Sequence, residues 1–272
     1  MAKKESTKGL GNTIYYEDER NDDFARLQFN PSALPEDWRY IHKNVFYRFF
    51  RFVIVQFLFV PLLQITSKVT YHTKVCNKKI LREVKHKGYI LYANHVTAFD
   101  PINHAVLVNG HKYSVIIASH DAFAVKWARP IVSFVGGFPV PKGELMWKNY
   151  LSATDYHVNH RRGKIVVYPE AHIWPYYTGI RDFKASSFNY PVNLNCPAVV
   201  ATTTFRLRKI TKKPKLVITL DGPFYPKLDL SHNDAVNELR DRVYLTMKMR
   251  ASDPDNYVFN TYIKKEKENN LA

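Results

Sequence analysis

The chain has 272 residues, of which 46% are hydrophobic and 14% aromatic, so it can bury a substantial core and is not a disordered protein. Lysine and arginine outnumber aspartate and glutamate by 40 to 24, and the resulting net charge of +16 favours nucleic acid, anionic lipid headgroups or phosphorylated substrates as partners. Two cysteines, Cys76 and Cys196, are too few for a disulfide framework and lack the paired spacing of a zinc site.

Residues 1–40 differ from the rest of the chain in composition. They carry 8 acidic and 6 basic side chains, so residues 41–272 carry a net charge of +18. The segment contains no apolar stretch like that of a secretory signal and shows no sustained periodicity. We expect it to form a polar arm that is extended or partly disordered.

A strongly apolar run follows, from Phe52 to Ile65, interrupted only by Gln56. Pro61 is expected to kink or divide it, and the run falls short of the roughly 20 apolar residues that span a bilayer. Basic residues flank it on both sides, as in helices that lie in a membrane interface. We therefore assign residues 41–68 to an interfacial helical segment; a buried core helix is the alternative. The flanking basic residues are Arg48, Arg51 and Lys68.

Beyond residue 69, strand-like runs alternate with helical ones, a pattern typical of an α/β fold with a mostly parallel sheet flanked by helices. We assign residues 69–272 to one such domain. The predicted strands cover residues 88–95, 113–119, 163–170, 197–207 and 215–222. The predicted helices cover residues 100–108, 143–163 and 231–251, the last starting at a capping serine, Ser231.

The first predicted strand leads into LYANHVTAFDP, which places His95 and Asp100 five residues apart. The plain interpretation is that Asp100 caps a helix whose first residue is Pro101. The functional interpretation is that the two side chains meet across a turn. The carboxylate would then hold one imidazole nitrogen while the other faces a cleft as a general base.

A metal site is a second functional interpretation of this region. Several potential ligands lie nearby in sequence, and SHDA contains the adjacent histidine and aspartate used in some metal phosphohydrolases. Those enzymes are helical, whereas this region alternates strands and helices, so we expect no metal. The potential ligands are His104, His111, His120 and Asp121.

Four short blocks in a fixed order resemble those of the glycerolipid acyltransferases related to 1-acyl-glycerol-3-phosphate acyltransferase. The resemblance covers roughly residues 70–225. The blocks are NHVTAFD (94–100), GGFPVPK (136–142), YPEAHI (168–173) and NCPAVV (195–200), and DFKASSF (182–188) resembles the family's segment between the last two. The resemblance implies that His95 is the base and Asp100 its orienting partner.

Two of the blocks depart from the family pattern. Lys142 stands where the second block usually ends in arginine, and it follows an apolar turn just before a predicted helix, so its ammonium could face a phosphate. The third block keeps Pro169 and Glu170, but Ile173 replaces an arginine associated with the acceptor phosphate. Arg181 and Lys184 are the nearest substitutes. The expected substrate-binding residues are Asn94, Lys142, Pro169, Glu170, Arg181 and Lys184.

The aromatic cluster HIWPYY (172–177) is compatible with the lining of an acyl or carrier channel and equally with loop packing. No serine or cysteine lies in a nucleophile-elbow pattern, which favours direct transfer without an acyl-enzyme.

The function predicted from the resemblance is acyl transfer from acyl-CoA or acyl-carrier protein to a lysophospholipid hydroxyl, foremost that of 1-acyl-glycerol-3-phosphate. The reaction would need no cofactor and would take place on the cytoplasmic face of the cell membrane, at a surface with anionic lipids. Two alternatives stay open: a relative that binds membrane lipid without catalysis, and a basic nucleic-acid-binding protein.

Overall fold

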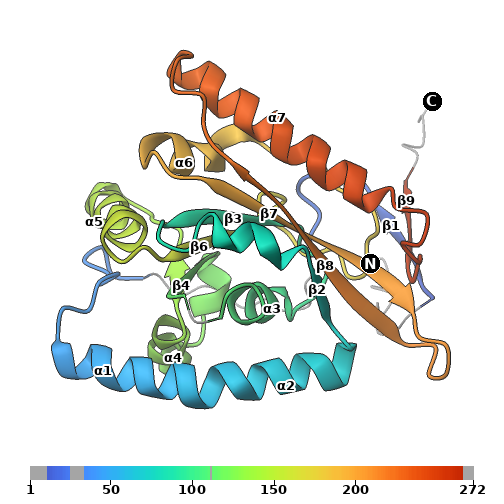
Figure 1. Cartoon of the computed structure of the whole chain (residues 1–272), viewed down its shortest axis with the longest axis horizontal. Helices are drawn as coiled ribbons and strands as arrows, with labels where there is room; N and C mark the ends of the chain where they lie inside the picture. The colour runs from blue at the N-terminus through green and yellow to red at the C-terminus, as the bar shows by residue number, and fades with distance from the viewer. Residues whose placement is uncertain (1–10, 25–33, 111, 266–272) are drawn as a thin grey trace, which may run out of the picture.

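The computed structural model describes residues 11–24, 34–110 and 112–265. Its centre is a twisted sheet of seven strands in the order β2-β8-β7-β3-β6-β4-β5, with helices on both faces (Figure 1). The strands are β2 (Lys74–Cys76), β3 (Tyr89–Ala93), β4 (Ser114–Ala118), β5 (Gly137–Pro139), β6 (Lys164–Val167), β7 (Ala198–Leu207) and β8 (Pro214–Phe224). The predicted α/β class with a mostly parallel sheet is confirmed.

One neighbouring pair, β7 and β8, is antiparallel, whereas the other neighbours in this sheet run parallel. Only residues 208–213 join these two strands, and so short a connection allows only an antiparallel hairpin. Strand β6 ends three residues earlier than predicted, because Pro169 has no N–H to donate to a ladder. Strands β2 and β5 were not predicted, since three residues are too few to show a periodicity.

Strand β3 is buried on both faces, which explains its unbroken apolar sequence. Ile90 and Tyr92 pack on the side of α5, α6 and α7. Leu91 and its neighbours pack on the opposite side, beside the end of α3. The helices are α1 (Val45–Ile54), α2 (Val60–Tyr71), α3 (Asp100–Val106), α4 (Arg129–Phe134), α5 (Glu144–Asp155), α6 (Asn189–Asn193) and α7 (His232–Ala251). The three helices predicted beyond residue 69 are present as α3, α5 and α7.

Helices α1 and α2 are two parts of one long helix, Val45–Tyr71, that runs along the edge of the molecule (Figure 1). A π-helical turn, η1 (Val55–Phe59), joins them. Pro61 therefore does not divide the helix. The wider turn shifts the carbonyls that the proline ring would otherwise meet.

By length and composition this helix could cross a membrane, which corrects the expectation that it is too short. Its most apolar window has a mean hydropathy of 1.8, and 11% of that window is buried. Polar side chains make some of its contacts with the body: Ser67 Oγ donates to Asn103 Oδ1 at 2.7 Å and Gln64 Nε2 donates to the Val106 carbonyl at 3.4 Å. Val60 is also buried there. Most of its large apolar side chains stay exposed.

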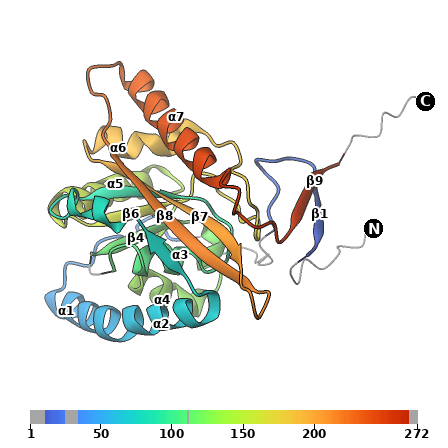
Figure 2. The same ribbon diagram turned by 45° about the vertical axis from the view of Figure 1, so that its right-hand side comes forward.

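Of the predicted arm, residues 1–10 and 25–33 lie outside the described residues. Strand β1 (Thr13–Tyr16) pairs in parallel with β9 (Thr261–Lys264), so the two ends of the described chain form a small second sheet beside the main one (Figure 2). Trp174 packs against it, with its ring 4.7 Å from Tyr16 and 4.8 Å from Tyr262. The predicted boundaries at residues 40 and 68 stay predictions.

Lys164 at the start of β6 holds the end of α3 in place. The residue is fully buried, and burial lowers the pKa of its ammonium well below the usual range. Its Nζ donates to the carbonyls of His104 (3.1 Å), Ala105 (2.8 Å) and Asn109 (3.4 Å), and to that of Val108. Carbonyls at a helix end have no partner within the helix, so this side chain satisfies them.

The Lys164→Met variant should lose about 2–3 kcal/mol of unfolding free energy, because Met keeps the volume but leaves these carbonyls unsatisfied. Urea unfolding measures the loss. Lys148→Met on the exposed face of α5 is the control, with an expected change within about 0.5 kcal/mol. Equal midpoints for the two variants would contradict this role of Lys164.

Candidate active site

His95 and Asp100 meet across the turn between β3 and α3, as the sequence predicts. His95 Nδ1 lies 3.2 Å from Asp100 Oδ2. The His95 side chain is 11% exposed, whereas that of Asp100 is fully buried. Because an ionised carboxylate only accepts hydrogen bonds, Nδ1 must carry the proton, and Nε2 is left with a lone pair. Within the described part of the chain, no hydrogen bond engages Nε2.

The Asp100 carboxylate organises this turn instead of capping the helix. It accepts from the backbone N–H groups of Val96 (2.6 Å) and Thr97 (2.7 Å), and Thr97 Oγ1 donates to its other oxygen at 2.7 Å. The capping position belongs to Phe99, and Asp100 is the first residue of α3. This corrects the plain interpretation of the sequence: the donors precede the carboxylate in the chain and do not come from the helix.

These donors decide the charge of Asp100. Burial opposes ionisation, but the hydrogen bond and charge of His95, the nearby His104 and the Thr97 hydroxyl outweigh it, so the pKa of Asp100 lies below its ordinary value. Asp100 is therefore ionised at neutral pH. It can stabilise positive charge on His95 when that ring takes up a proton.

A second layer of side chains fixes the His95 ring. The Tyr168 ring stacks on it with centroids 4.2 Å apart, and the Tyr168 hydroxyl lies 2.8 Å from His104 Nδ1. The other ring nitrogen of His104 lies 3.2 Å from Thr203 Oγ1. Burial lowers the pKa of His104 to about 4, so this histidine is a neutral structural group. The position of the His95 ring is therefore set before any substrate arrives.

Asn94 ties β3 to β7 at the same point. Its Nδ2 donates to the Thr203 carbonyl at 3.0 Å, and its Oδ1 accepts from the Thr203 N–H at 2.8 Å. Both ends of the amide are used and the side chain is buried. In this structure the side chain holds the strand that carries His95; contact of Asn94 with a substrate stays a prediction.

The family model for acyltransferases matches residues 72–203, which include the His95 and Asp100 turn, the second and third blocks and the start of β7. This match shows similarity to the acyltransferase family over just under half of the chain. No curated protein sequence matches it at a significant level. Among solved structures, it is similar to the 1-acyl-sn-glycerophosphate (LPA) acyltransferase PlsC from Thermotoga maritima. That match has a TM-score of 0.52, 14% sequence identity and coverage of 76% of this chain and 94% of the other. At this identity the similarity concerns the fold.

The third block forms an internal network. Glu170 is 4% exposed, and its carboxylate accepts from the backbone N–H of His95 at 3.3 Å and of Arg181 at 3.1 Å. The Arg181 guanidinium lies 3.5 Å from Glu170, donates to the His172 carbonyl and stacks over Trp174 with 4.9 Å to its ring. Glu170, one of the expected substrate-binding residues, is therefore buried in this structure. It supports the backbone of His95.

Arg181 is buried in this network, so as folded here it does not reach out toward an acceptor phosphate. The cluster 172–177 packs in the same place: Trp174 is buried and contacts aromatic rings from both ends of the chain. Of the two possibilities for this cluster, the structure shows loop packing. Sequence patterns cannot separate a buried arginine from a substrate-binding one, because both are polar residues in a loop.

Lys142, Pro169 and Lys184 are the expected binding residues that stay accessible. The two lysines are exposed and Pro169 is half-buried. Lys142 precedes α5, which begins at Glu144, and it follows β5 at the sheet edge that also bears His95. Three strand spacings separate β5 from β3, roughly 14 Å. Contact of Lys142, Pro169 and Lys184 with a substrate stays a prediction.

The potential metal ligands do not converge. His104 bonds Tyr168 and Thr203, and His120 lies 2.7 Å from the Val140 carbonyl. His111 lies outside the described residues. Within residues 11–24, 34–110 and 112–265, no three His, Cys, Asp or Glu side chains gather closely enough to hold a metal ion.

Three residues of the site were missed by sequence reasoning: Tyr168, Thr97 and His104. Thr97 lies within the first block and Tyr168 begins the third, so the blocks point to the right segments. The sequence alone does not indicate which side chain stacks on the histidine. His104 was considered as a metal ligand.

The Arg181→Met variant should lose about 3 kcal/mol of unfolding free energy, because the buried Glu170 carboxylate would lose its cationic partner. The exposed Lys184→Met variant serves as the control, with little change expected. In the double variant Glu170→Gln with Arg181→Met, part of the loss should be recovered, since no unpaired charge is then buried. Additive losses in urea unfolding would show that the two side chains do not interact.

Proposed function

We propose that this acyltransferase moves a fatty acyl group from an acyl thioester, acyl-CoA or acyl-carrier protein, to a lysophospholipid hydroxyl. The observation that carries the proposal is the Asp100 carboxylate holding His95 Nδ1 at 3.2 Å, which leaves Nε2 as a base. An alcohol does not attack a thioester at useful rates near neutral pH unless a positioned group removes its proton.

The chemistry follows from this geometry. His95 Nε2 takes the hydroxyl proton as the oxygen attacks the thioester carbonyl carbon. The resulting imidazolium is stabilised by Asp100. The carbon–sulfur bond then breaks, the new ester is released, and the proton passes from His95 to the departing thiolate. These steps need no cofactor or metal, and no acyl-enzyme forms.

We propose 1-acyl-glycerol-3-phosphate as the acceptor, because the family's acceptors are glycerolipids and the net charge of +16 favours phosphorylated substrates. The accessible Lys142 and Lys184 are the candidates for its phosphate. With Ile173 in place of the family's arginine and Arg181 buried, lysine supplies a point charge without the planar fork of arginine, so selection for the phosphate should be loose.

The decisive experiment incubates the purified protein with labelled acyl-CoA or acyl-carrier protein and a panel of lysolipids, and identifies products by mass. His95→Ala should reduce the rate by about 10³-fold or more, and Asp100→Asn by about 10²–10⁴-fold, because the wrong nitrogen of the ring would then carry the proton. Transfer should be fastest to 1-acyl-glycerol-3-phosphate.

Binding of lipid and of vesicles should be unchanged in His95→Ala. If the unaltered protein transfers no acyl group to any acceptor but still binds lipid, the protein is a non-catalytic relative. Retention on DNA with no binding to vesicles would instead support a nucleic-acid-binding protein.

We also propose that the helix Val45–Tyr71 holds the enzyme on the cytoplasmic face of the cell membrane, at a surface rich in anionic lipid. Its large apolar side chains are exposed along most of its length, an arrangement that water does not favour. The body of the protein lies against one side of the helix, which suits a helix lying in the interface. The exposed side chains are Val45, Phe46, Phe49, Phe50, Phe52, Ile54, Phe57, Leu58, Leu62, Ile65 and Val69.

Replacing Phe50 and Phe57 together by Ser should weaken binding to vesicles at least about tenfold, because each loses the burial of a phenyl ring in lipid. The two residues lie seven apart on one helix face. Ile210→Ser at the tip of the β7–β8 hairpin, 94% exposed, is the matched control and should not change binding. Vesicle flotation measures the effect, and equal binding by the control and the double variant would exclude the helix as the attachment.

A further inference from the structure

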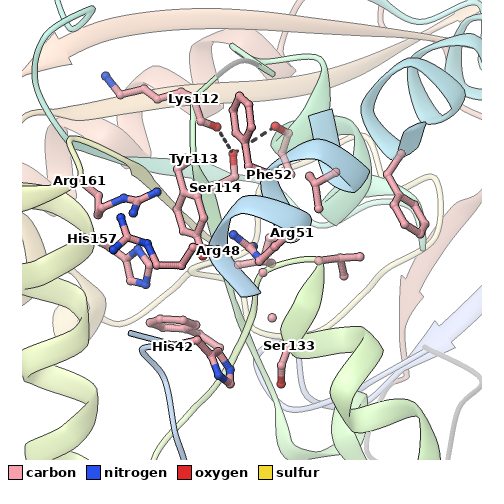
Figure 3. A pocket seen from close by; sticks show the side chains of 18 of the residues that line it. His42, Arg48, Arg51, Phe52, Lys112, Tyr113, Ser114, Ser133, His157 and Arg161 are labelled. Atoms are coloured by element: carbon pink, nitrogen blue, oxygen red, sulfur yellow. Dashed lines mark hydrogen bonds between the residues drawn. The ribbon is translucent and has the colours of Figure 1, made fainter. Parts of the chain in front are cut away.

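We propose a second ligand site, separate from the acyl-transfer centre: the cavity between the long N-terminal helix and the beginnings of β4 and β5 binds the phosphate of an anionic membrane phospholipid. The cavity has a volume of about 270 Å³ (Figure 3). Helix α1, the segment before β4 and the end of the helix that follows β5 all contribute to it.

The cavity wall is positively charged. No aspartate or glutamate lines it, and none of its lysine or arginine side chains has a carboxylate within 4 Å in the described part of the chain. One of them, Lys112, points away from the cavity and donates to the carbonyls of Val84 and Lys85 (Figure 3). The basic side chains in the wall are Arg39, Arg48, Arg51, Lys112 and Arg161, together with His42 and His157.

Arg51 and Arg161 converge on one aromatic ring. The guanidinium carbons of Arg51 and Arg161 lie 4.2 and 5.1 Å from the Tyr113 ring centre. Arg51 is 7% exposed, and its Nε donates to the Phe134 carbonyl at 2.5 Å. Burying an arginine without a carboxylate is costly, and two guanidinium groups on one ring also repel each other. An anion bound in the cavity near both groups would offset both costs.

His157 supplies the observation that points most directly to a ligand. It is 4% exposed, it stacks on Tyr113 with ring centres 5.0 Å apart, and both of its ring nitrogens are buried without a hydrogen-bond partner. Burial, with Arg51 and Arg161 nearby, lowers the pKa of His157 to about 3, so the ring is neutral and offers one N–H donor. Ser133 Oγ in the same wall also lacks a partner. Buried polar groups are normally hydrogen-bonded, so these atoms fit the oxygens of an absent ligand.

The rest of the cavity indicates a lipid and not a small free anion. Phe52, Val55, Phe59 and Leu63 of the long helix also line the cavity, and the same helix exposes apolar side chains to the outside. A ligand with a phosphate at one end and hydrocarbon at the other matches this arrangement. The proposed membrane face of the protein would bring such molecules to the cavity.

The site cannot serve the acceptor of the transfer reaction. Ser114 pairs with Lys164, and Lys164 pairs with Tyr89, so the charged end of the cavity is level with the beginning of β3. His95 lies six residues further along, up to roughly 20 Å away. In 1-acyl-glycerol-3-phosphate the free hydroxyl is on the carbon next to the phosphorylated one, too close to bridge that distance. A phosphate in the cavity therefore belongs to another molecule.

The test uses phosphatidylglycerol, which is neither substrate nor product of the proposed reaction. Water-soluble short-chain phosphatidylglycerol should raise the melting temperature of the whole protein, whereas inorganic phosphate and short-chain phosphatidylcholine at the same concentration should not. Arg161→Gln should weaken its binding about tenfold, the usual effect of losing one charge-assisted hydrogen bond. Arg82→Gln removes the same charge from an exposed position outside the cavity and should have no effect.

The His157→Phe variant tests whether His157 binds a ligand or only packs in the core. Phenylalanine fits between Tyr113 and Phe138 and removes two unsatisfied nitrogens, so the fold should be as stable as before or more so, while phosphatidylglycerol binding falls. Three results would overturn the proposal: unchanged binding in both Arg161→Gln and His157→Phe, equal losses in Arg161→Gln and Arg82→Gln, or stabilisation by inorganic phosphate equal to that by the lipid. Because the experiment measures lipid binding, its outcome does not depend on whether acyl transfer is detected.

Discussion

One buried carboxylate organises the turn that carries the candidate catalytic histidine. Asp100 accepts two backbone N–H groups, a hydroxyl and His95 Nδ1–H, and each of these donors lies between β3 and α3. Without the carboxylate, buried donors in a tight turn would be left unsatisfied, at a cost of about 1–3 kcal/mol each. The same bonds keep Asp100 ionised and select the His95 tautomer. Folding of the turn and preparation of the base are therefore the same physical event.

The polar residues around this turn bond to other parts of the protein. Glu170 holds the backbone N–H of His95 while Arg181 balances its charge, Asn94 fixes β3 to β7, and Lys164 holds the end of α3. All four are polar, buried and close to the centre of the sheet formed by β3, β6 and β7. A rigid support of this kind is what a general base needs, because proton transfer depends on hydrogen-bond distance.

The sequence predicted the parts of the structure that are encoded locally or in ordered blocks. Periodicity located five strands and three helices, and the spacing of His95 and Asp100 within the first block located the base. It missed β5 because three residues show no pattern, and it did not anticipate that a π-helical turn would carry the helix past Pro61. It could not predict that Glu170 and Arg181 face inward, since burial depends on what the rest of the chain places around them.

The proposed phosphate site could not be predicted from the sequence either. Arg51, Tyr113, His157 and Arg161 come from three separate segments, and no local pattern joins them. Only the fold brings a helix with apolar exposed side chains over a wall without carboxylates. The two proposed sites lie at opposite edges of the sheet: the acyl-transfer site at the edge that bears His95, and the phosphate site at the other.

The most direct test of the central claim is ¹⁵N NMR of the His95 imidazole at neutral pH, assigned with His95→Ala. The account predicts that the neutral form of the ring carries its proton on Nδ1 and a lone pair on Nε2, and that Asp100→Asn moves this proton to Nε2. A ring with the proton on Nε2 in the unaltered protein, or spectra that do not respond to Asp100→Asn, would contradict it.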